Sequence, residues 1–294
     1  MTYTGGWIAK ASKAFGVPLT RHTAEKAVGP CPYCHTGVDR FIVWQDGNAW
    51  CNQCHRTGWW LPATEAMQRV AAARSERAER QTELLARMAA CTDWQTYQSI
   101  LFANGGQHLA DWYEHGISED EIIRWGLGYC DACPLARDSP SLTLPVFVNQ
   151  RLVDIRHRLL KGQQGDKYRS HLAGLVPSIF NTDALSAARV VLVVEGEKKV
   201  IASVRAGFPA SLGMPGAQFT AQLLDVLAAA APDQLIVLAL DPDKVRDAEQ
   251  IALRIGGMGR VADFTMKPDD FLLRYGPAAY AETIRQAREV RAAH

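Results

Sequence analysis

Short apolar runs alternate with helix-forming stretches along the C-terminal third of the chain. The compact runs of Val, Leu and Ile predict buried strands. From residue 189 onward the order is strand, helix, strand, helix, and the expected strands are 190–194, 210–212, 235–240 and 261–265. The expected helices are 198–205, 219–231, 245–255, 270–275 and 278–293. Alternation of this kind is typical of parallel βαβ units with right-handed crossovers.

The segment that precedes residue 189 has a different pattern. The expected strands here are 142–148 and 151–159, joined by a turn at 149–150. Ser118 and Glu121 stand at the N-cap and capping-box positions of a short helix that ends at Gly126, and a loop is expected at 127–133. A mixed α+β region is therefore expected ahead of the parallel sheet.

The N-terminal part combines short strands with one long helix. Two strands, 40–44 and 48–50, are expected around a turn at Asp46-Gly47. A helix is expected over 63–103, where no Gly or Pro interrupts the chain, and alternating Arg and Glu at 74–80 predict a solvated face with i,i+4 ion pairs. The favoured interpretation of this helix is a spacer with no chemistry of its own.

Composition and charge narrow the class of protein. The chain has 294 residues, of which 48% are hydrophobic and 21% charged, with a net charge of +1. This is ordinary for a globular protein with two domains and a small module. No run approaches the roughly 20 apolar residues of a membrane span and the N-terminus lacks a signal-peptide core, so a cytoplasmic protein with no membrane partner is expected. Residues 151–172 hold six Lys or Arg, a basic stripe suited to phosphate binding.

Six of the seven cysteines fall into three Cys-x-x-Cys pairs. Cys31 and Cys34 form one knuckle and Cys51 and Cys54 form another, and the hairpin between the knuckles would bring the four thiolates together. In a reducing compartment this spacing favours a tetrahedral, structural Zn²⁺ site over redox-active thiols.

Other potential ligands lie near the cysteine pairs. His35 and His55 adjoin the two knuckles and either could replace a cysteine, but surface histidines are the favoured interpretation. The third pair, Cys130 and Cys133, has no matching second pair, because Cys91 is isolated on the expected linker helix. A second metal site at this pair is therefore the less favoured interpretation.

Acidic residues follow two of the expected parallel strands. Glu195 and Glu197 follow the first strand of the series, and Asp241 and Asp243 follow the third. Parallel strands place their carboxyl ends at one edge of a sheet, so these carboxylates are expected to converge in one crevice. Carboxylates that converge would repel unless divalent cations neutralised them, which predicts an Mg²⁺ or Mn²⁺ site for phosphoryl transfer.

Taken together, these features resemble a known group of proteins. Glu-Gly after one apolar strand and Asp-x-Asp after another are similar to the toprim fold, which bacterial and phage primases share with topoisomerases and some nucleases. The upstream four-cysteine ribbon, the 116–129 segment and the basic hairpin at 156–168 narrow the resemblance to DnaG-type primases and the primase half of phage primase-helicases. The resemblance covers the ribbon and residues from about 105 to 276.

The resemblance implies four regions. They are a zinc-ribbon DNA-binding domain at 1–62, a helical linker at 63–104, a basic subdomain at 105–188 and a toprim domain with C-terminal helices at 189–294. The expected fold class is thus an α/β toprim-type parallel-sheet core with a mixed α+β N-terminal subdomain, preceded by a small zinc-ribbon module and a helical linker.

The resemblance also assigns roles to the acidic residues. Glu195 matches the essential toprim glutamate, which takes part in metal binding or acid–base chemistry. Asp241 and Asp243 match the metal-binding Asp-x-Asp. Asp269 matches an acid of a later Asp-Pro-Asp motif and is a further ligand candidate. The resemblance therefore implies that these residues hold catalytic Mg²⁺ or Mn²⁺.

Two positions depart from the family pattern. Lys199 stands where primases commonly have an Asp, four residues after the glutamate, and Lys267 stands at the first Asp of the later motif. These changes would lower metal affinity, or Lys199 would bind nucleotide phosphate directly. Glu197 and Asp263 are the substitutes expected among the acids, and the plain alternative for Lys199 and its neighbour Lys198 is a solvated first helical turn.

The expected activity is synthesis of short RNA primers on single-stranded DNA from ribonucleoside triphosphates. Tyr168 is expected to stack on a base. The residues expected to bind triphosphate or template backbone are Arg156, Arg158, Lys167 and Arg169, with Lys199 as a further phosphate ligand. The aromatic residues expected to help the ribbon read template are Tyr33, Trp44, Trp50, Trp59 and Trp60.

Other functions are compatible with the same residues. A primase-derived, non-catalytic single-stranded DNA-binding factor accounts for the two lysines in place of acids, and a toprim nuclease accounts for the acidic cluster. A topoisomerase is disfavoured because no region remains for a nucleophilic tyrosine. No helicase domain is found, so a replicative helicase partner is expected to be a separate polypeptide.

Overall fold

The computed structural model describes residues 6–61, 63–103, 106, 108–133, 139–160, 167–216 and 219–290, without the side chains of residues 21, 63–67 and 133. Contacts within the chain divide it into two compact units, Met1–Thr82 and Glu83–His294. None of the described helices is long and apolar enough to cross a membrane.

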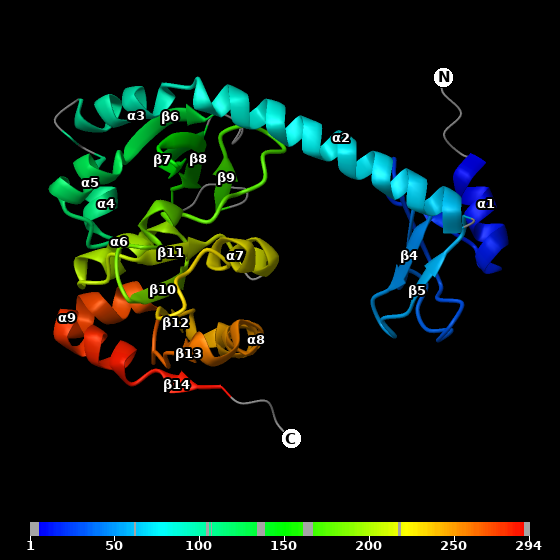
Figure 1. The fold of residues 1–294 in the computed structure, drawn as a ribbon. Helices are drawn as coiled ribbons and strands as arrows, with labels where there is room; N and C mark the ends of the chain where they lie inside the picture. The colour runs from blue at the N-terminus through cyan, green and yellow to red at the C-terminus, as the bar shows by residue number, and fades with distance from the viewer. Residues whose placement is uncertain are drawn as a thin grey trace. The chain divides into compact units, whose positions relative to one another are not determined.

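The first unit is an antiparallel sheet with a helix beside it (Figure 1). The helix is α1 (Gly6–Phe15), and the strands, in spatial order, are β1 (Thr20–Arg21), β2 (Lys26–Gly29), β3 (Phe41–Trp44), β4 (Asn48–Cys51) and β5 (Thr57–Trp59). The two expected strands are β3 and β4, so that hairpin is confirmed. The other three strands were not expected, because they are short and carry few β-branched residues. A small core forms where Trp7 of α1 stacks on Trp60 at 6.1 Å between ring centroids.

The expected single helix at 63–103 is wrong, because the structure has two. They are α2 (Ala63–Ala89) and α3 (Asp93–Phe102). At the C-terminal end of α2, Leu84 and Met88 pack against Leu152 and Ile155. The chain then turns so that α3 lies along the antiparallel sheet of the second unit. Asp93 occupies the first turn of α3, where its negative charge interacts favourably with the helix dipole. Tertiary packing thus ends a run that local propensity would continue.

An antiparallel sheet follows in the second unit. Its strands, in spatial order, are β6 (Gly128–Cys133), β7 (Ser139–Val148), β8 (Arg151–Leu159) and β9 (Tyr168–Ser170). The expected strands β7 and β8 are confirmed, and their turn residues Asn149 and Gln150 have the positive φ angles, 50° and 59°, of a tight hairpin. The loop expected at 127–133 is wrong: this segment is β6, and Gly128 allows the backbone of α3 to approach it closely.

Two short helices precede β6. They are α4 (Leu109–Tyr113) and α5 (Glu119–Trp125). The capping box of α5 is confirmed, because Ser118 Oγ accepts from the Glu121 amide while Glu121 accepts from the Ser118 amide. Gly126 ends the helix with a φ of 64°, which favours glycine.

The expected parallel sheet is present in the second unit. Its strands, in spatial order, are β11 (Ser211–Met214), β10 (Val190–Glu195), β12 (Leu235–Leu238), β13 (Gly259–Val261) and the antiparallel edge strand β14 (Arg288–Glu289). The helices are α6 (Glu197–Arg205), α7 (Thr220–Leu227), α8 (Val245–Ile255) and α9 (Pro268–Arg285), and short 3₁₀ turns lie at Thr182–Ala184, Pro242–Lys244 and Gly256–Met258.

Two expectations for the end of the chain are wrong. The strand expected at 261–265 ends at Val261. The two expected helices are present as the two halves of α9, which a non-helical residue, Gly276 (φ 79°, ψ 173°), separates by a kink. The helix expected to reach residue 293 stops at Arg285. Arg288 then pairs across β13 and forms ion pairs with Asp263 and Glu249, which is what converts the tail into a strand.

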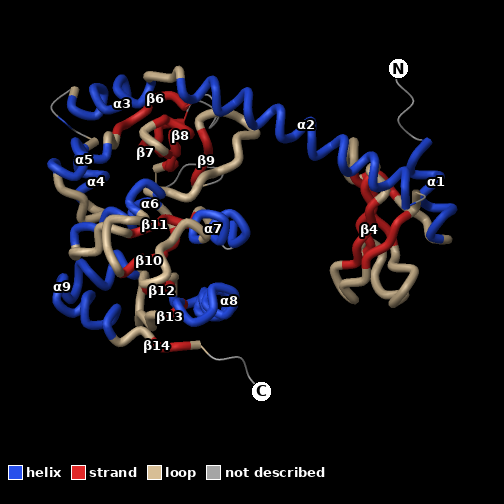
Figure 2. Tube along the Cα trace, viewed as in Figure 1, coloured by secondary structure: helices blue, strands red, loops and turns tan. Residues whose placement is uncertain are grey.

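Helices cover both faces of the parallel sheet (Figures 1 and 2). On one face Val191 and Val193 of β10 pack with α7 and α8, and on the other face Leu192 and Val194 pack with α6 and α9. A strand buried on both faces is apolar at every position, which is why these runs were conspicuous in the sequence. The carboxyl edge of the sheet is thereby left as the place where polar side chains collect.

Candidate functional site

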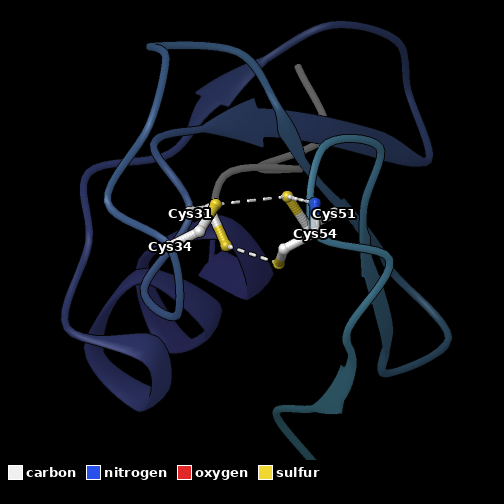
Figure 3. A group of neighbouring side chains, drawn as sticks. All are labelled: Cys31, Cys34, Cys51 and Cys54. Carbon is white, nitrogen blue, oxygen red and sulfur yellow. Dashed lines mark hydrogen bonds between the residues drawn. The ribbon is translucent and has the colours of Figure 1, made fainter.

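Four cysteines of the first unit form a compact cluster (Figure 3). The Sγ atoms of Cys31 and Cys54 are 3.8 Å apart, as are those of Cys34 and Cys51. A tetrahedral zinc ion with Zn–S bonds of about 2.3 Å requires sulfur–sulfur separations of about 3.8 Å. The cluster therefore fits a structural Zn²⁺ ion held by these four residues.

The surroundings of the cluster support the thiolate form at some positions. A hydrogen bond with Thr36 lowers the pKa of Cys34 to about 6, whereas burial raises the pKa of Cys31 to about 11. Backbone amides of Tyr33 and Gln53 donate to the sulfurs of the two knuckles. His35 and His55 are exposed, in agreement with the surface role favoured for them.

In the second unit, acidic residues converge at the carboxyl edge of the parallel sheet. Glu195 ends β10, Glu197 begins α6, Asp241 follows β12 and Asp269 lies in the first turn of α9. Because β10 and β12 are neighbouring parallel strands, Glu195 and Asp241 reach the same edge. These residues line a cavity of about 350 Å³, together with Arg156, Lys167, Tyr168, Gly196, Lys198, Lys199, Pro215 and Lys267.

Lysines occupy the space between these carboxylates. Lys199 Nζ lies 3.0 Å from Asp241 Oδ1 and donates to the carbonyl oxygen of Glu195 at 3.1 Å. Lys198 Nζ lies 3.9 Å from Asp269 Oδ2, and burial lowers the pKa of Lys198 to about 8. Only 12% of the Lys199 side chain and 15% of the Lys198 side chain are exposed. A solvated first helical turn is therefore the wrong interpretation of these two lysines.

Arg156 is part of a buried ion network. Its Nε lies 3.2 Å from Glu197 Oε1, its Nη1 lies 3.4 Å from Asp154 Oδ2, and the same Nη1 donates to Ser170 Oγ. Burial raises the pKa of the Asp154 carboxyl, an effect that Arg156 opposes. Arg156 is thus held in place by two carboxylates and supports Glu197 at the cavity wall.

Only some of the residues expected to bind substrate line the cavity. Lys167 and Tyr168 line the cavity, and burial raises the pKa of the Tyr168 hydroxyl to about 12. Arg158 and Arg169 are outside the set of described residues that line it, and Arg158 Nη1 instead lies 2.7 Å from His115 Nε2.

Two of the acidic candidates also lie outside the cavity. Asp243 is exposed in the 3₁₀ turn after Asp241 and is not among the described residues that line the cavity. Asp263, considered as a substitute ligand, pairs with Arg288 Nε at 2.8 Å.

The cavity offers the donor type that a divalent cation prefers, although among the described residues no three of its acidic side chains have ligand atoms within 4.8 Å of one another. Glu195, Asp241 and Asp269 supply carboxylate oxygens, the ligands that Mg²⁺ and Mn²⁺ prefer. Within the described part of the chain, the buried oxygen Oδ1 of Asp269 has no hydrogen-bond partner. A buried carboxylate oxygen without a donor is costly unless a cation or water satisfies it.

The cavity also has an unusual balance of charge. Among the described residues, its lining contains four carboxylates, Glu195, Glu197, Asp241 and Asp269, and five cationic groups, Arg156, Lys167, Lys198, Lys199 and Lys267. A lining that is cationic overall attracts anions such as a triphosphate, and it binds a metal ion less strongly than an all-acidic lining would.

The sequence signal missed part of this site. Lys198 is not among the residues expected to bind substrate, and Pro215 follows β11, whose sequence has no polar signature. Outside the cavity, the sequence predicts no partner for Cys91, yet its Sγ lies 3.9 Å from His171 Nε2. Residues 80 apart in sequence meet there only because α3 and β9 belong to the same unit, and no local pattern encodes that.

Comparison with known proteins identifies the fold. No family model and no curated protein matches the sequence. The Aquifex aeolicus primase, as its zinc-binding and RNA polymerase domains, aligns with a TM-score of 0.57 and 13% identity over 98% of this chain and 86% of that chain.

Two further structures match about seven tenths of this chain. The RNA polymerase domain of Mycobacterium tuberculosis primase DnaG, in complex with a double-stranded DNA oligomer with a 6-nucleotide overhang, aligns with a TM-score of 0.57 and 19% identity over 71% of this chain and 81% of that chain. A DnaG primase catalytic domain bound to single-stranded DNA aligns with a TM-score of 0.55 and 14% identity over 72% of this chain and 84% of that chain.

The chain therefore has the fold of a primase, in which a zinc-binding module precedes a catalytic core. The four-cysteine cluster lies in the module expected to bind zinc. The resemblance and the fold class expected from the sequence are confirmed at the level of the fold.

Proposed function

We propose that the chain is a DNA primase that synthesises short RNA primers on single-stranded DNA by metal-dependent nucleotidyl transfer. The observation that carries this proposal is the meeting of Glu195, Asp241 and Asp269 beside lysines in a cavity at the edge of the parallel sheet. The fold likeness supports it, since the similar structures include domains named for RNA polymerase activity and complexes with DNA. We also propose that the parallel sheet, with the acidic residues at its carboxyl edge, is a toprim domain.

Three carboxylates would hold the catalytic cation. Glu195, Asp241 and Asp269 are its proposed ligands, and Asp243 would have to turn inward to join them. When bound, Mg²⁺ or Mn²⁺ lowers the pKa of an attacking 3′-hydroxyl and neutralises charge on the leaving pyrophosphate. The chain's own contribution is to fix the carboxylates at the ends of rigid elements.

Basic residues of the cavity would bind the nucleotide. Lys167, Lys199 and Lys267 line it and would donate charge-assisted hydrogen bonds to the triphosphate. Tyr168 would stack on a base. Arg156 supports Glu197 from behind, while Arg158 and Arg169 remain candidates for the template backbone.

The first unit would contribute template reading. Tyr33 is 37% exposed and Trp59 is 50% exposed, so both rings offer stacking surfaces for bases. The Arg56 guanidinium lies over the Tyr33 ring at 5.8 Å and adds positive charge beside it. Trp60 instead donates its indole hydrogen to the Trp44 carbonyl and belongs to the unit's own core. A separate helicase remains the proposed partner in replication.

One observation favours a second candidate function. Lys199 already neutralises Asp241 at 3.0 Å, and the lining as a whole is cationic. A non-catalytic factor that binds single-stranded DNA through this surface would need no metal.

A priming assay separates the two functions. Single-stranded DNA, labelled ribonucleoside triphosphates and Mn²⁺ are expected to give short RNA products with the wild-type chain. Asp241→Asn is expected to reduce synthesis by at least about 100-fold, because it removes a charged ligand. Asp247→Asn is the matched control, since its carboxylate pairs with Lys244 on the surface. DNA binding without synthesis would favour the non-catalytic factor, and degradation of the template would favour a nuclease.

A further inference from the structure

A second group of metal-ligating side chains lies outside the acidic cavity. Cys91 follows α2, Asp93 begins α3 and His171 follows β9. One ligand atom from each residue lies within 4.8 Å of the other two. The His171 Nε2 atom is 3.9 Å from Cys91 Sγ and 3.2 Å from Asp93 Oδ2.

These separations match the edges of a metal tetrahedron. With Zn–S bonds of about 2.3 Å and Zn–N and Zn–O bonds of about 2.0–2.1 Å, the nitrogen–sulfur edge is about 3.6 Å and the nitrogen–oxygen edge about 3.3 Å. The two distances from His171 Nε2 differ from these edges by a few tenths of an ångström, and the third pair, Cys91 and Asp93, lies within 4.8 Å. Small side-chain rotations would therefore be enough to bring the three atoms onto one ion.

Buried groups behind His171 fix its orientation. Its Nδ1 lies 3.0 Å from His157 Nε2, and His157 Nδ1 lies 3.0 Å from Ser141 Oγ. His157 and Ser141 are almost fully buried. The Tyr97 ring presses edge-on against both imidazoles, and Asp154 accepts the His171 backbone amide.

These contacts determine which nitrogen of each imidazole carries the hydrogen. If His171 Nε2 binds a metal, its Nδ1 carries the hydrogen and donates to His157 Nε2. His157 then carries its hydrogen on Nδ1 and donates to Ser141 Oγ. Every imidazole nitrogen is satisfied, and an outer hydrogen bond of this kind is the usual support of a metal-bound histidine.

We propose that Cys91, Asp93 and His171 form a second zinc-type site, with the fourth position of the tetrahedron open to water. A thiolate and an imidazole favour Zn²⁺ over Mg²⁺, so this site is distinct in kind from the carboxylate cavity. The ion would join the turn between α2 and α3 to the end of β9, the strand that carries Tyr168 into the cavity. The site is independent of the proposed primase activity.

Cobalt provides a direct test on the full chain, purified with its four-cysteine cluster filled with zinc. Added Co²⁺ is expected to give a thiolate-to-cobalt charge-transfer band, because Cys91 is a ligand. None of the described residues that line the carboxylate cavity is a cysteine, so a cobalt ion held by them cannot give this band. Cys91→Ser is expected to abolish the band, and His171→Gln to remove the bound cobalt at the same concentrations.

Controls assign the band to this cluster. Cys130→Ser is the matched control, since it removes another thiol of the same unit, and the band is expected to persist. Asp93→Asn changes a side chain that is 54% exposed and should leave the fold intact, while it weakens cobalt binding by about 10-fold or more. This variant decides the question if His171→Gln fails to fold.

Three results would overturn the proposal. They are the absence of a charge-transfer band in the wild type, its persistence in Cys91→Ser, and its loss in Cys130→Ser. The first would leave Asp93 and His171 as an ion pair beside a bystander thiol, and the third would assign the band to the Cys130–Cys133 pair. Unchanged affinity in Asp93→Asn would likewise exclude that residue as a ligand.

Discussion

Lys199 places an ammonium group 3.0 Å from Asp241, in the region where the proposed cation would be held. A fixed positive charge at this distance competes with a metal ion for the same carboxylate. Lys199 therefore has two effects on the proposed reaction, since it weakens metal binding and adds a donor for triphosphate.

Replacing Lys199 separates these effects. Lys199→Met keeps an unbranched side chain that is one atom shorter and removes its charge, so we expect Mn²⁺ affinity to rise by about 10-fold, as one nearby repulsion is lost. Electron paramagnetic resonance of a Mn²⁺ titration measures this directly. Lys244→Met is the control, because Lys244 pairs with Asp247 at the surface. Unchanged or weaker Mn²⁺ binding in Lys199→Met would contradict the competition described here.

The sequence predicted the acids of the site better than its bases. Glu195 and Asp241 were located because each follows a continuous apolar run, a pattern that specifies where a parallel strand ends. The burial of Lys198 and Lys199 depends on how α6 docks beside α9, which no local pattern encodes. Cys91 and His171 were missed for the same reason.

At the scale of elements, the start of α5 is connected to α6 in the second unit. Glu121 closes the capping box with Ser118 and also pairs with Arg205 of α6 at 3.1 Å. Helix α6 begins with Glu197 at the cavity. The capping box thus stabilises α5, and α5 contacts α6, the helix that carries Glu197 at the cavity.

Removing the cap should lower stability by a measurable amount. Ser118→Ala is expected to reduce the free energy of unfolding by about 1 kcal/mol, because a helix N-cap hydrogen bond is lost. A thermal melt should show the midpoint of the second unit falling by about 2–4 °C. Ser75→Ala, on an exposed face of α2, is the control, and equal melts for both variants would show that the cap contributes nothing.

Burial of Tyr280 in α9 links stability to alkaline pH. Its hydroxyl hydrogen-bonds with Ser203 Oγ at 2.7 Å, and burial raises its pKa above the ordinary value. Above about pH 10 a tyrosine ionises in the unfolded chain while Tyr280 stays protonated in the folded one, so its contribution to stability falls as pH rises.

Comparison with Tyr280→Phe measures this effect. The variant is expected to be about 1 kcal/mol less stable at neutral pH, and the difference should shrink above pH 10. Urea unfolding at several pH values gives both quantities. Tyr275→Phe, a change at a half-exposed ring of the same helix, is the control at neutral pH. A difference that grows with pH would contradict the assignment.

The sequence predicts most accurately those helices and strands whose hydrophobic pattern and flanking turn residues agree. Helix α8 was predicted at its observed bounds, Val245–Ile255, and β8 at Arg151–Leu159, since pattern and turn residues agree there. The sequence predicts a loop at β6 because this strand is formed by its pairing with β7, and the break between α2 and α3 follows from docking on the sheet. Nonlocal pairing thus accounts for both errors.

At the scale of the whole molecule, the chain consists of two units with separate cores. The core of the first unit includes Cys31 and Cys51, so zinc ligation and packing are combined there. A unit of this size has few apolar contacts to replace a lost metal.

Loss of the zinc ligands should therefore unfold one unit only. In the variant Cys51→Ser with Cys54→Ser, hydrogen exchange is expected to lose protection across β2–β5 and to keep it in β10 and β12. Thr57→Ser, on the same sheet, is the control. Protection lost in both units, or kept in both, would contradict the separation of the cores.

Anomalous diffraction from crystals soaked with Mn²⁺ and a non-hydrolysable ribonucleoside triphosphate tests the proposed site most directly. The account predicts a manganese peak within about 2.3 Å of carboxylate oxygens of Glu195, Asp241 and Asp269, with the Lys199 ammonium moved from Asp241 to the triphosphate. A map without manganese in this cavity, in which Lys199 still pairs with Asp241, would contradict it.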